Sequence, residues 1–467
     1  MITEKLARFV VETPLDKIPA SVLQGARDAL IDTIGVAIAG TLEPIADIAL
    51  AWLNDIGAKP QATFWGRPLR TSPAEAAFVN GMCAHALDFD DSLPSLRGHP
   101  SPTMVPAALA VAETVGASGA QVLAAHALGL EVAGKLGRAM GHGHYLRGWH
   151  STATIGAFSC TAAAARLWKL DVQQLRAAWG LTASQMSGLV RNFGTMTKPF
   201  HAGHAARIGV LSAWMAKHGF TADMSIFDGK NNVLDTYAGE DGVPFAEVVE
   251  RLGSPWEMIE PGIYVKRWPC CYCNHRPIGG LLALIEKHGI KPQEVNAIEI
   301  GFPPGSDTAL VSQNPTTGLE GKFSIEYVAA ATVLDGKLTL ETFTDAMVQR
   351  PAVRALMAKS RRYRIEDQGV FSGVVGYNDI AIDTTRGRFE MRVDKVPGSP
   401  AAPMTPQDRI EKFLDCASRV LGEPGAKHLL GLLERCSELA DARELVRATV
   451  PKGGSDKRAI ASAGIAP

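Results

Sequence analysis

Residues 152–170, TATIGAFSCTAAAARLWKL, decide the fold class of this 467-residue chain. In a helix of this sequence, small and apolar residues cover nearly every side, and such a helix has to be buried. Because the stretches on both sides of it are helical in pattern as well, the surroundings that bury it are other helices. The segment therefore predicts the centre of a large all-helical domain.

The stretches around this segment repeat apolar residues at three- and four-residue spacing, which is the helical period. Several end near glycine, the usual residue after a helix C-terminus. These stretches cover residues 20–40, 72–91, 102–116 and 119–141. With 46% hydrophobic residues overall, the chain has enough apolar side chains for a large core.

The pattern changes near residue 260. Residues 295–304 and 378–394 alternate β-branched and polar residues as strands do, while 325–336 and 351–363 are helical in pattern. A proline-rich linker follows, and Thr405 and Pro406 then have the features of a helix cap and a first helical residue. We predict a mainly α protein: an all-helical domain from residues 1–262 and 403–467, a smaller α+β lid over 263–402, and a frayed end over 450–467.

Composition argues against several classes of partner. The chain has 47 basic and 48 acidic residues and a net charge of −1, so it lacks the basic excess of nucleic-acid-binding proteins. We find no run of about 18 apolar residues for a membrane span and no secretory apolar region at the start. The seven cysteines are unevenly spread, which favours a reducing, cytoplasmic location over a disulfide framework.

Five short segments concentrate polar residues within apolar surroundings. They are HALDFDDS (85–92), GHPSP (98–102), GHGHYLRGWHS (141–151), GTMTKPFHAGHAAR (194–207) and KRWPCCYCNHRP (266–277). If the fold brings them together, they form a positively charged pocket with several potential proton carriers.

Some residues of these segments can also be explained by ordinary structural roles. A carboxylate at a helix C-terminus, as at Asp88, is unfavourable for the helix dipole, which favours another role for it. Asp90 and Asp91 fit a loop start equally well, and His142 and His144 are expected to be structural. Lys198 precedes a proline among small residues, and a lysine in apolar surroundings tends toward its neutral form and can act as a base.

No metal or cofactor is predicted. The cysteines of CCYC lack the second ligand pair of a structural zinc site, and no facial-triad spacing of histidine and aspartate occurs. A GxGxxG motif after a strand, a phosphate-binding GxxxxGK[ST] loop and a GxSxG nucleophile elbow are all missing from the sequence.

Taken in order, the segments resemble the MmgE/PrpD family. The resemblance rests on HALDFDDS, GHPSP, GWHSTATIGAFSCTAAAARLWKL, GTMTKPFHAGHAARIGVLSAWMAKHGFTA, KRWPCCYCNHRPI and GKFSIEYVAAATVLDG, and it spans roughly residues 5–450. The family includes 2-methylcitrate dehydratases, cis-aconitate decarboxylases and an iminodisuccinate epimerase. KRWPCCYCNHRP and the overall length are most similar to the epimerase, and Arg97 stands where the long dehydratases carry tryptophan.

The resemblance implies a homodimer without a cofactor, and it implies pocket residues at Asp88, Ser92, His99, His150, Lys198 and His275. Relatives often have threonine at the position of Ser92, which keeps the hydroxyl. It further implies a polycarboxylate as substrate and chemistry at a carbon next to a carboxylate.

Without a metal, fixed cations and donors have to stabilise the carbanion formed at such a carbon. Lys198, Lys266, Arg267 and Arg276 are suited to this, and arginine binds carboxylates with two parallel hydrogen bonds. We predict that Lys198 is one of two acid–base groups and that His99, His275 or Tyr145 is the other, with Asp88 orienting a neighbour. Epimerisation of iminodisuccinate is the leading prediction. The alternatives are a dehydratase or decarboxylase of the same family and, more remotely, a helical binding scaffold without activity.

Overall fold

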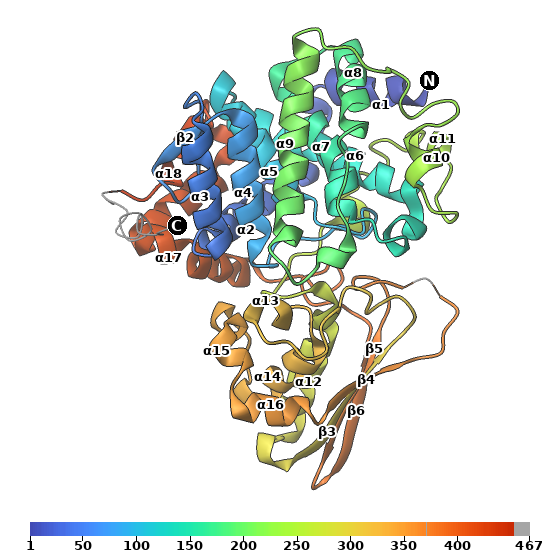
Figure 1. Cartoon of the computed structure of the whole chain (residues 1–467), viewed down its shortest axis with the longest axis vertical. Coiled ribbons are helices and arrows are strands. Elements are labelled where there is room, and N and C mark those ends of the chain that lie inside the picture. Colours follow the sequence, from blue (N-terminus) through green and yellow to red (C-terminus); the bar gives the residue numbers. More distant parts are fainter. Residues whose placement is uncertain (370, 453–467) are drawn as a thin grey trace.

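The computed structural model describes residues 1–369 and 371–452 and places them in two bodies (Figure 1). The larger body is helical and the smaller one combines helices with a sheet, so the predicted mainly α class is confirmed. Of the predicted frayed end, residues 453–467 lie outside the described part of the chain.

The larger body takes its helices from both ends of the chain. The N-terminal part supplies α1 (Ile2–Glu12), α2 (Ala20–Gly40), α3 (Pro44–Ile56), α4 (Pro73–Ala86), α5 (Ser101–Val115), α6 (Gly119–Leu146), α7 (Ser151–Trp168), α8 (Val172–Ala183), α9 (Thr197–Lys217), α10 (Val233–Tyr237) and α11 (Phe245–Val249). The C-terminal part supplies α17 (Pro406–Glu434) and α18 (Arg443–Ala448), and a small hairpin joins β1 (Ala62–Phe64) to β2 (Leu69–Thr71). Single helical turns occur in both bodies, at Leu15–Lys17, Val190–Asn192, Met258–Gly262, Tyr272–Asn274, Pro292–Glu294, Leu340–Phe343 and Cys436–Glu438.

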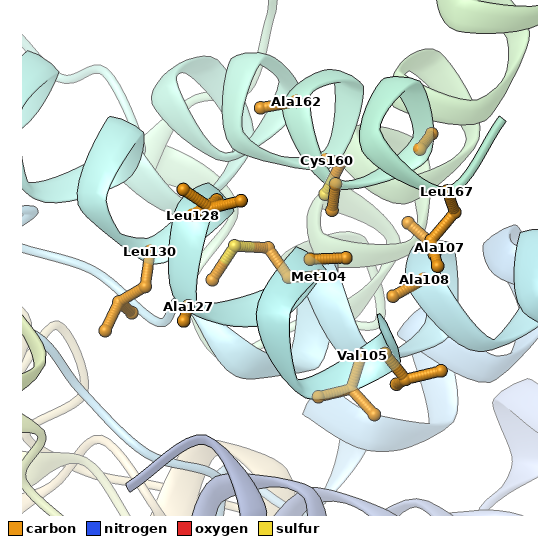
Figure 2. Close-up of a cluster of buried hydrophobic side chains, with 14 of the residues drawn as sticks. Met104, Val105, Ala107, Ala108, Ala127, Leu128, Leu130, Cys160, Ala162 and Leu167 are labelled. Carbon is orange, nitrogen blue, oxygen red and sulfur yellow. The ribbon is translucent and has the colours of Figure 1, made fainter. Parts of the chain in front are cut away.

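Helix α7 lies at the centre of this body, as its sequence predicts. Every residue of α7 except Arg166 is buried. Figure 2 shows Cys160 of α7 facing Met104 of α5 and Leu128 of α6 in a closely packed cluster. At the C-terminal end of the chain, Phe413 and Leu429 of α17 join the same core, and α17 packs along α2.

Glycines at the crossing of α4 and α9 bring together the two helix ends that form the site. A Cβ atom added to Gly81 of α4 would lie 2.7 Å from the Cα atom of Gly203 in α9, which is far too close. The two backbones therefore approach as closely as only glycine allows. As a result, Asp88, just beyond the end of α4, lies next to Lys198 at the start of α9.

The smaller body is a four-stranded sheet with helices on one side (Figure 1). The strand order is β4-β3-β5-β6, with β3 parallel to β4 and antiparallel to β5, and β5 and β6 forming a hairpin. The strands are β3 (Val295–Phe302), β4 (Ser360–Arg364), β5 (Asn378–Thr384) and β6 (Gly387–Val393). The helices are α12 (His275–His288), α13 (Gly318–Gly321), α14 (Ile325–Asp335), α15 (Asp345–Val348) and α16 (Pro351–Met357).

Most of the expected elements of the smaller body are confirmed, and one is wrong in part. Strands β3, β5 and β6 and helix α14 fall where the patterns predict them. The stretch 351–363 was expected to be helical throughout, but its helix ends at Met357 and Ser360 opens strand β4. Pairing with the edge of β3, from Ile298 opposite Ser360 onward, outweighs the local helical preference. The short strands β1 and β2 were not predicted.

The predicted domain boundaries stay a prediction, because a core shows which segments pack together and not where a domain begins. A second hydrophobic core, separate from the first, is built from residues 268–382 together with Phe193 of the larger body. Within the described residues, none of the helices alone has the length and apolar character of a membrane span, although α2 and α3, bent by 82° at their junction, pass that test as a pair.

Candidate active site

A cavity lies where the two bodies meet, and the space between its lining atoms, part of it open to bulk solvent, is about 650 Å³. The larger body lines it with Asp88, Ser92, Leu93, Arg97, Gly98, His99, His142, Tyr145, His150, Phe193 and Lys198. The smaller body contributes Cys271, Tyr272, Cys273, Thr308, Ala309, Phe323, Ser372, Gly373 and Val374. Residues more than 280 positions apart in the sequence therefore face one space.

Asp88 is buried between two lysines. Lys198 Nζ contacts one carboxylate oxygen, and Lys266 Nζ lies 3.1 Å from the other and donates to the backbone carbonyl of Asp88 at 2.8 Å. Burial opposes ionisation of Asp88, but the two ammonium groups outweigh it and hold the pKa of this carboxyl below its usual range. The backbone of Asp88 has φ 50°, a left-handed conformation that aspartate tolerates better than most residues.

The lysines also resolve the unfavourable position of Asp88 after a helix. Lys322 Nζ donates to the carbonyl of Leu87 at 2.7 Å, so two ammonium groups meet the carbonyls at the end of α4. Cations at a helix C-terminus complement the helix dipole. The carboxylate is thus tolerated there because cations surround it.

Lys198 differs from its sequence expectation. Its ammonium group lies over Phe193 and Phe323, at 5.3 and 5.0 Å from the ring centres, but it also contacts Asp88 directly. A carboxylate partner stabilises the charged ammonium, as does the face of an aromatic ring. The surroundings of Lys198 therefore include a carboxylate as well as two ring faces, which the sequence did not predict, and its role as an acid–base group stays a prediction.

The loop from Asp88 to His99 carries a carboxylate between two imidazoles. Asp90 accepts from Nδ1 of His85 at 2.9 Å and lies 3.0 Å from Nδ1 of His99. The His99 Nδ1 is also 2.7 Å from the carbonyl oxygen of Asp91. Burial opposes ionisation of Asp90, but His85 and His99 outweigh it and hold its pKa well below the usual range. Burial lowers the pKa of His99, although Asp90 opposes that shift.

The next carboxyl, Asp91, behaves in the opposite way. Burial raises the pKa of Asp91 to about 8, and its oxygens contact the backbone N–H and hydroxyl of Ser101. Ser101 in turn lies 3.1 Å from Nε2 of His126. Of the two adjacent aspartates, Asp90 is therefore the charged one and serves the imidazoles, whereas Asp91 anchors the start of α5.

His150 lies at the N-terminus of α7 and faces the cavity with a second histidine behind it. Its Nδ1 is 3.0 Å from Nδ1 of His201, one helical turn after Lys198. Burial lowers the pKa of both rings, that of His201 to about 4. Because the two nitrogens face each other, one Nδ1 donates and the other accepts. His144, by contrast, is fully engaged with Tyr237 and Thr154 and is structural, as expected.

Four residues of the segment KRWPCCYCNHRP were predicted as site residues, yet the structure brings none of them into the lining of the cavity. Lys266 lies beneath Asp88, and His275 is fully buried against Tyr272 and Trp268. Arg276 is buried and donates to the carbonyl of Gly373 at 3.2 Å. Arg267 is half-exposed, with its guanidinium 4.0 Å from Asp408.

The structure also brings in lining residues that were not predicted. Arg97 has φ 53° and faces the cavity, where it donates to the carbonyl of Gly137 at 3.3 Å. His142, expected to be structural, is another lining residue. The departure from tryptophan at position 97 was the only sequence signal for Arg97, and no signal distinguished His142 from His144.

The remaining predicted residues, Ser92 and Tyr145, do line the cavity. Burial raises the pKa of Tyr145 well above its usual value, so its hydroxyl stays protonated and can donate. Ser92 Oγ lies 3.4 Å from Nδ1 of His99. Two thiols, those of Cys271 and Cys273, complete this wall, and every cysteine in the chain is unpaired and buried.

One cluster among the described residues has the spacing of a metal site. Donor atoms of His85, Asp90 and His99 all lie within 4.8 Å of one another. The 2.9 Å contact of His85 Nδ1 with Asp90 is a hydrogen bond, and His99 Nδ1 lies 3.0 Å from the other oxygen of the same carboxylate. Within residues 1–369 and 371–452, the cysteines of CCYC form no such cluster with other possible metal ligands.

The fold and the cavity together define a class: a mainly helical protein whose smaller α+β body covers a polar cavity on the larger one. Comparison with known proteins identifies it further. Residues 4–246 match the MmgE/PrpD N-terminal domain and residues 268–438 the MmgE/PrpD C-terminal domain, and the chain belongs to this family of enzymes.

Curated relatives match along nearly their whole length. Cis-aconitate decarboxylase from Homo sapiens is 28% identical over 97% of this chain and 95% of its own length. The enzyme of that name from Mus musculus is 26% identical over 96% and 93%, and the one from Aspergillus terreus is 24% identical over 96% of both chains.

Proposed function

We propose that this protein is a lyase that acts on a polycarboxylate by moving a proton at a carbon next to a carboxylate. The observation that carries the proposal is the charged cluster of Asp88, Lys198 and Lys266 beside the imidazole of His99. Cis-aconitate is the first substrate to test, because relatives that match along their whole length carry the name of its decarboxylase.

The residues divide into two roles. The ammonium group of Lys198 offers a fixed positive charge and a proton, and preorganised charges of this kind stabilise a developing carbanion. The imidazoles of His99 and His150 and the hydroxyl of Tyr145 are the groups that exchange protons with the substrate. Ser92 and Arg97 bind its carboxylates. For His275, Lys266, Arg267 and Arg276 we propose support of the cavity wall or its rim rather than contact with substrate.

In decarboxylation, the bond between the carboxylate carbon and its neighbour breaks and CO₂ leaves. The electron pair stays on the remaining carbon skeleton, where the ammonium group of Lys198 offsets its charge. A proton from Lys198 or an imidazole then completes the product. In dehydration, a base removes the proton instead and an acid protonates the leaving hydroxyl, which the same residues allow.

Epimerisation of iminodisuccinate remains the second candidate. It is supported by two proton-exchanging groups, His99 and Lys198, and by Arg97 as an additional cation for a substrate rich in carboxylates. The three reactions give different products, so one set of incubations separates them.

The experiment is incubation of the purified protein with cis-aconitate, 2-methylcitrate and iminodisuccinate. Released CO₂, a new C=C absorbance and a change in optical rotation are followed in parallel. We expect CO₂ or a change in unsaturation. A change in rotation with neither of these would identify an epimerase, and no change with any substrate would favour the binding scaffold.

We further propose a cytoplasmic homodimer that binds neither nucleic acid nor membrane. A groove that Phe78 helps to line is surrounded by exposed apolar residues of α3, of α9 and of the residue just before α9, among them Ile48, Trp52, Met196 and Phe200, and these would face the second copy. Sedimentation equilibrium should give twice the chain mass. The substitution Trp52→Glu should shift it toward a monomer, and a monomeric parent protein would contradict this part of the proposal.

A further inference from the structure

Asp90 occupies an unusual position among the carboxylates near the cavity. It is fully buried, it does not line the cavity, and yet it contacts a residue that does. Both of its oxygens accept from Nδ1 of His85, at 2.9 and 3.0 Å, and one of them also lies 3.0 Å from Nδ1 of His99 at ion-pair distance. A carboxylate accepts hydrogen bonds only, so Nδ1 of His85 carries a proton.

The carbonyl oxygen of Asp91 fixes the same tautomer of His99, because it also accepts from Nδ1 at 2.7 Å. With the proton on Nδ1, Nε2 of His99 has a free lone pair. Within residues 1–369 and 371–452 this Nε2 forms no hydrogen bond with the protein, and the ring lines the cavity. The ring thus presents a proton acceptor to whatever the cavity binds.

The surroundings of His99 favour its neutral imidazole, which can accept a proton at Nε2. Burial of the ring disfavours the imidazolium, as do the positive charges of Lys266 and Lys198. Asp90 favours it and offsets part of this effect, and the pKa of His99 stays lowered. A carboxylate in this position also steadies the imidazolium that forms when a proton arrives. A neutral carbonyl such as that of Asp91 supplies orientation but not charge.

We propose that Asp90 is a positioning residue that holds the Nδ1–H groups of His99 and His85 and thereby presents Nε2 of His99 to the cavity as the proton acceptor. The role in turnover rests on the proposed function, whereas the tautomer does not. The tautomer of His99 and the role of Asp90 in turnover can therefore be disproved separately, and each is tested by its own measurement.

The central variant is Asp90→Asn, which keeps size and shape. An amide has one oxygen and one NH₂ group, so it can accept a hydrogen bond from only one of the two imidazoles. Its NH₂ group then faces the Nδ1–H of the other imidazole, where two donors meet. We expect kcat to fall by about 10²-fold with KM changed less than threefold, in line with the contribution of one acid–base group. Replacement of the catalytic aspartate of a serine protease by asparagine acts through the same change of tautomer.

The direct readout is the ¹⁵N spectrum of histidine-labelled protein, with the signal of His99 assigned through His99→Gln. We expect Nδ1 protonated and Nε2 unprotonated in the parent protein, and a loss of this pattern for His99 or His85 in Asp90→Asn. Adding His85→Phe to Asp90→Asn removes the competing donor, so the amide oxygen can serve His99. This double variant should regain at least tenfold of the lost kcat, which a general packing defect would not allow.

The control is Glu131→Gln, which replaces another fully buried carboxylate. Glu131 accepts from the backbone N–H groups of Gly253 and Glu257, outside the cavity. It should lose stability but keep kcat and the His99 signal. Unchanged ¹⁵N signals in Asp90→Asn would overturn the positioning role even with activity lost. A stoichiometric metal ion bound to the parent protein at His85, Asp90 and His99 would overturn it as well. Changed signals with no turnover on any substrate would overturn the proposed function alone.

Discussion

The loop 88–99 and the segment 266–276 contain similar residues but use them differently. Both combine cations or carboxylates with histidine, and both lie beside the cavity. The loop presents Ser92 and His99 to the open space, whereas the segment buries Lys266 and His275 and turns Arg267 outward.

The difference follows from what each stretch is attached to. The loop leaves α4 at Asp88 with a positive φ and is held at its other end by the contacts of Asp91 with Ser101, so its middle faces the gap between the bodies. The segment leads into α12 and the second core; Cys271, Tyr272 and Cys273 line the cavity, but neighbouring residues cover Lys266 and His275. The type of a residue therefore predicts its chemical role only when it is also known whether its side chain faces the cavity, the core or the solvent.

The largest effect is expected when Lys198, the lysine beside the loop 88–99, is replaced. Lys198→Met should lower kcat by about 10²–10⁴-fold, because the variant lacks both a proton donor and the charge beside the reacting carbon. Steady-state kinetics on the active substrate measures this. Lys217→Met, on the last turn of the same helix, is the control and should stay within twofold. Retention of one tenth of the parent kcat in Lys198→Met would refute the assignment.

The corresponding lysine of the second segment should act mainly on stability. Lys266→Met leaves the buried carboxylate of Asp88 with one cation instead of two and a backbone carbonyl without its donor. We expect a loss of about 3 kcal/mol in the free energy of unfolding, at the lower end of the range for broken buried ion pairs. Urea denaturation measures it, and a change below about 1 kcal/mol would mean that Lys198 alone satisfies Asp88.

The buried histidine of the segment predicts a dependence of stability on pH. Burial lowers the pKa of His275 to about 3 from the usual 6.5. Between these values the unfolded chain binds a proton that the native protein does not, so stability is lost as the pH falls below 6.5. One such group contributes about 2 kcal/mol between pH 6.5 and 5. His275→Phe should make the fall shallower by that amount in urea titrations at both pH values, and an unchanged slope would contradict it.

The smallest effect is expected at Arg267. Its side chain is half-exposed and the residue does not line the cavity, so Arg267→Ala should change KM less than twofold. Arg97→Ala, which removes a guanidinium from the lining, should raise KM about tenfold or more, as expected for a charged contact worth more than about 1.4 kcal/mol. Equal effects of the two substitutions would mean that the segment also binds substrate.

Much of the fold could be predicted from the sequence because its signals are local. The apolar α7 identified the helical core, and alternation identified β3, β5 and β6. Strand β4 was missed because its pairing partner lies about 60 residues away, and no local pattern records that contact.

The site was predicted less completely. Asp88, His99, His150 and Lys198 were found through residue types and through the family resemblance, and they do line one cavity. The pairing of Lys198 with Asp88, the bridge at Asp90 and the inward turn of Arg97 depend on which side chains the packed bodies bring within 3 to 4 Å. A single sequence carries no signal for such distances.

The most direct test of the central claim is the count of solvent deuterium in the product of a turnover in D₂O, read by mass spectrometry. For the parent protein the account predicts one deuterium in the product for each CO₂ released, or for each α-proton exchanged. The Lys198→Met variant should incorporate deuterium only at its residual rate of turnover. Decarboxylation or epimerisation that leaves the product free of deuterium, or equal rates of incorporation by parent and variant, would contradict it.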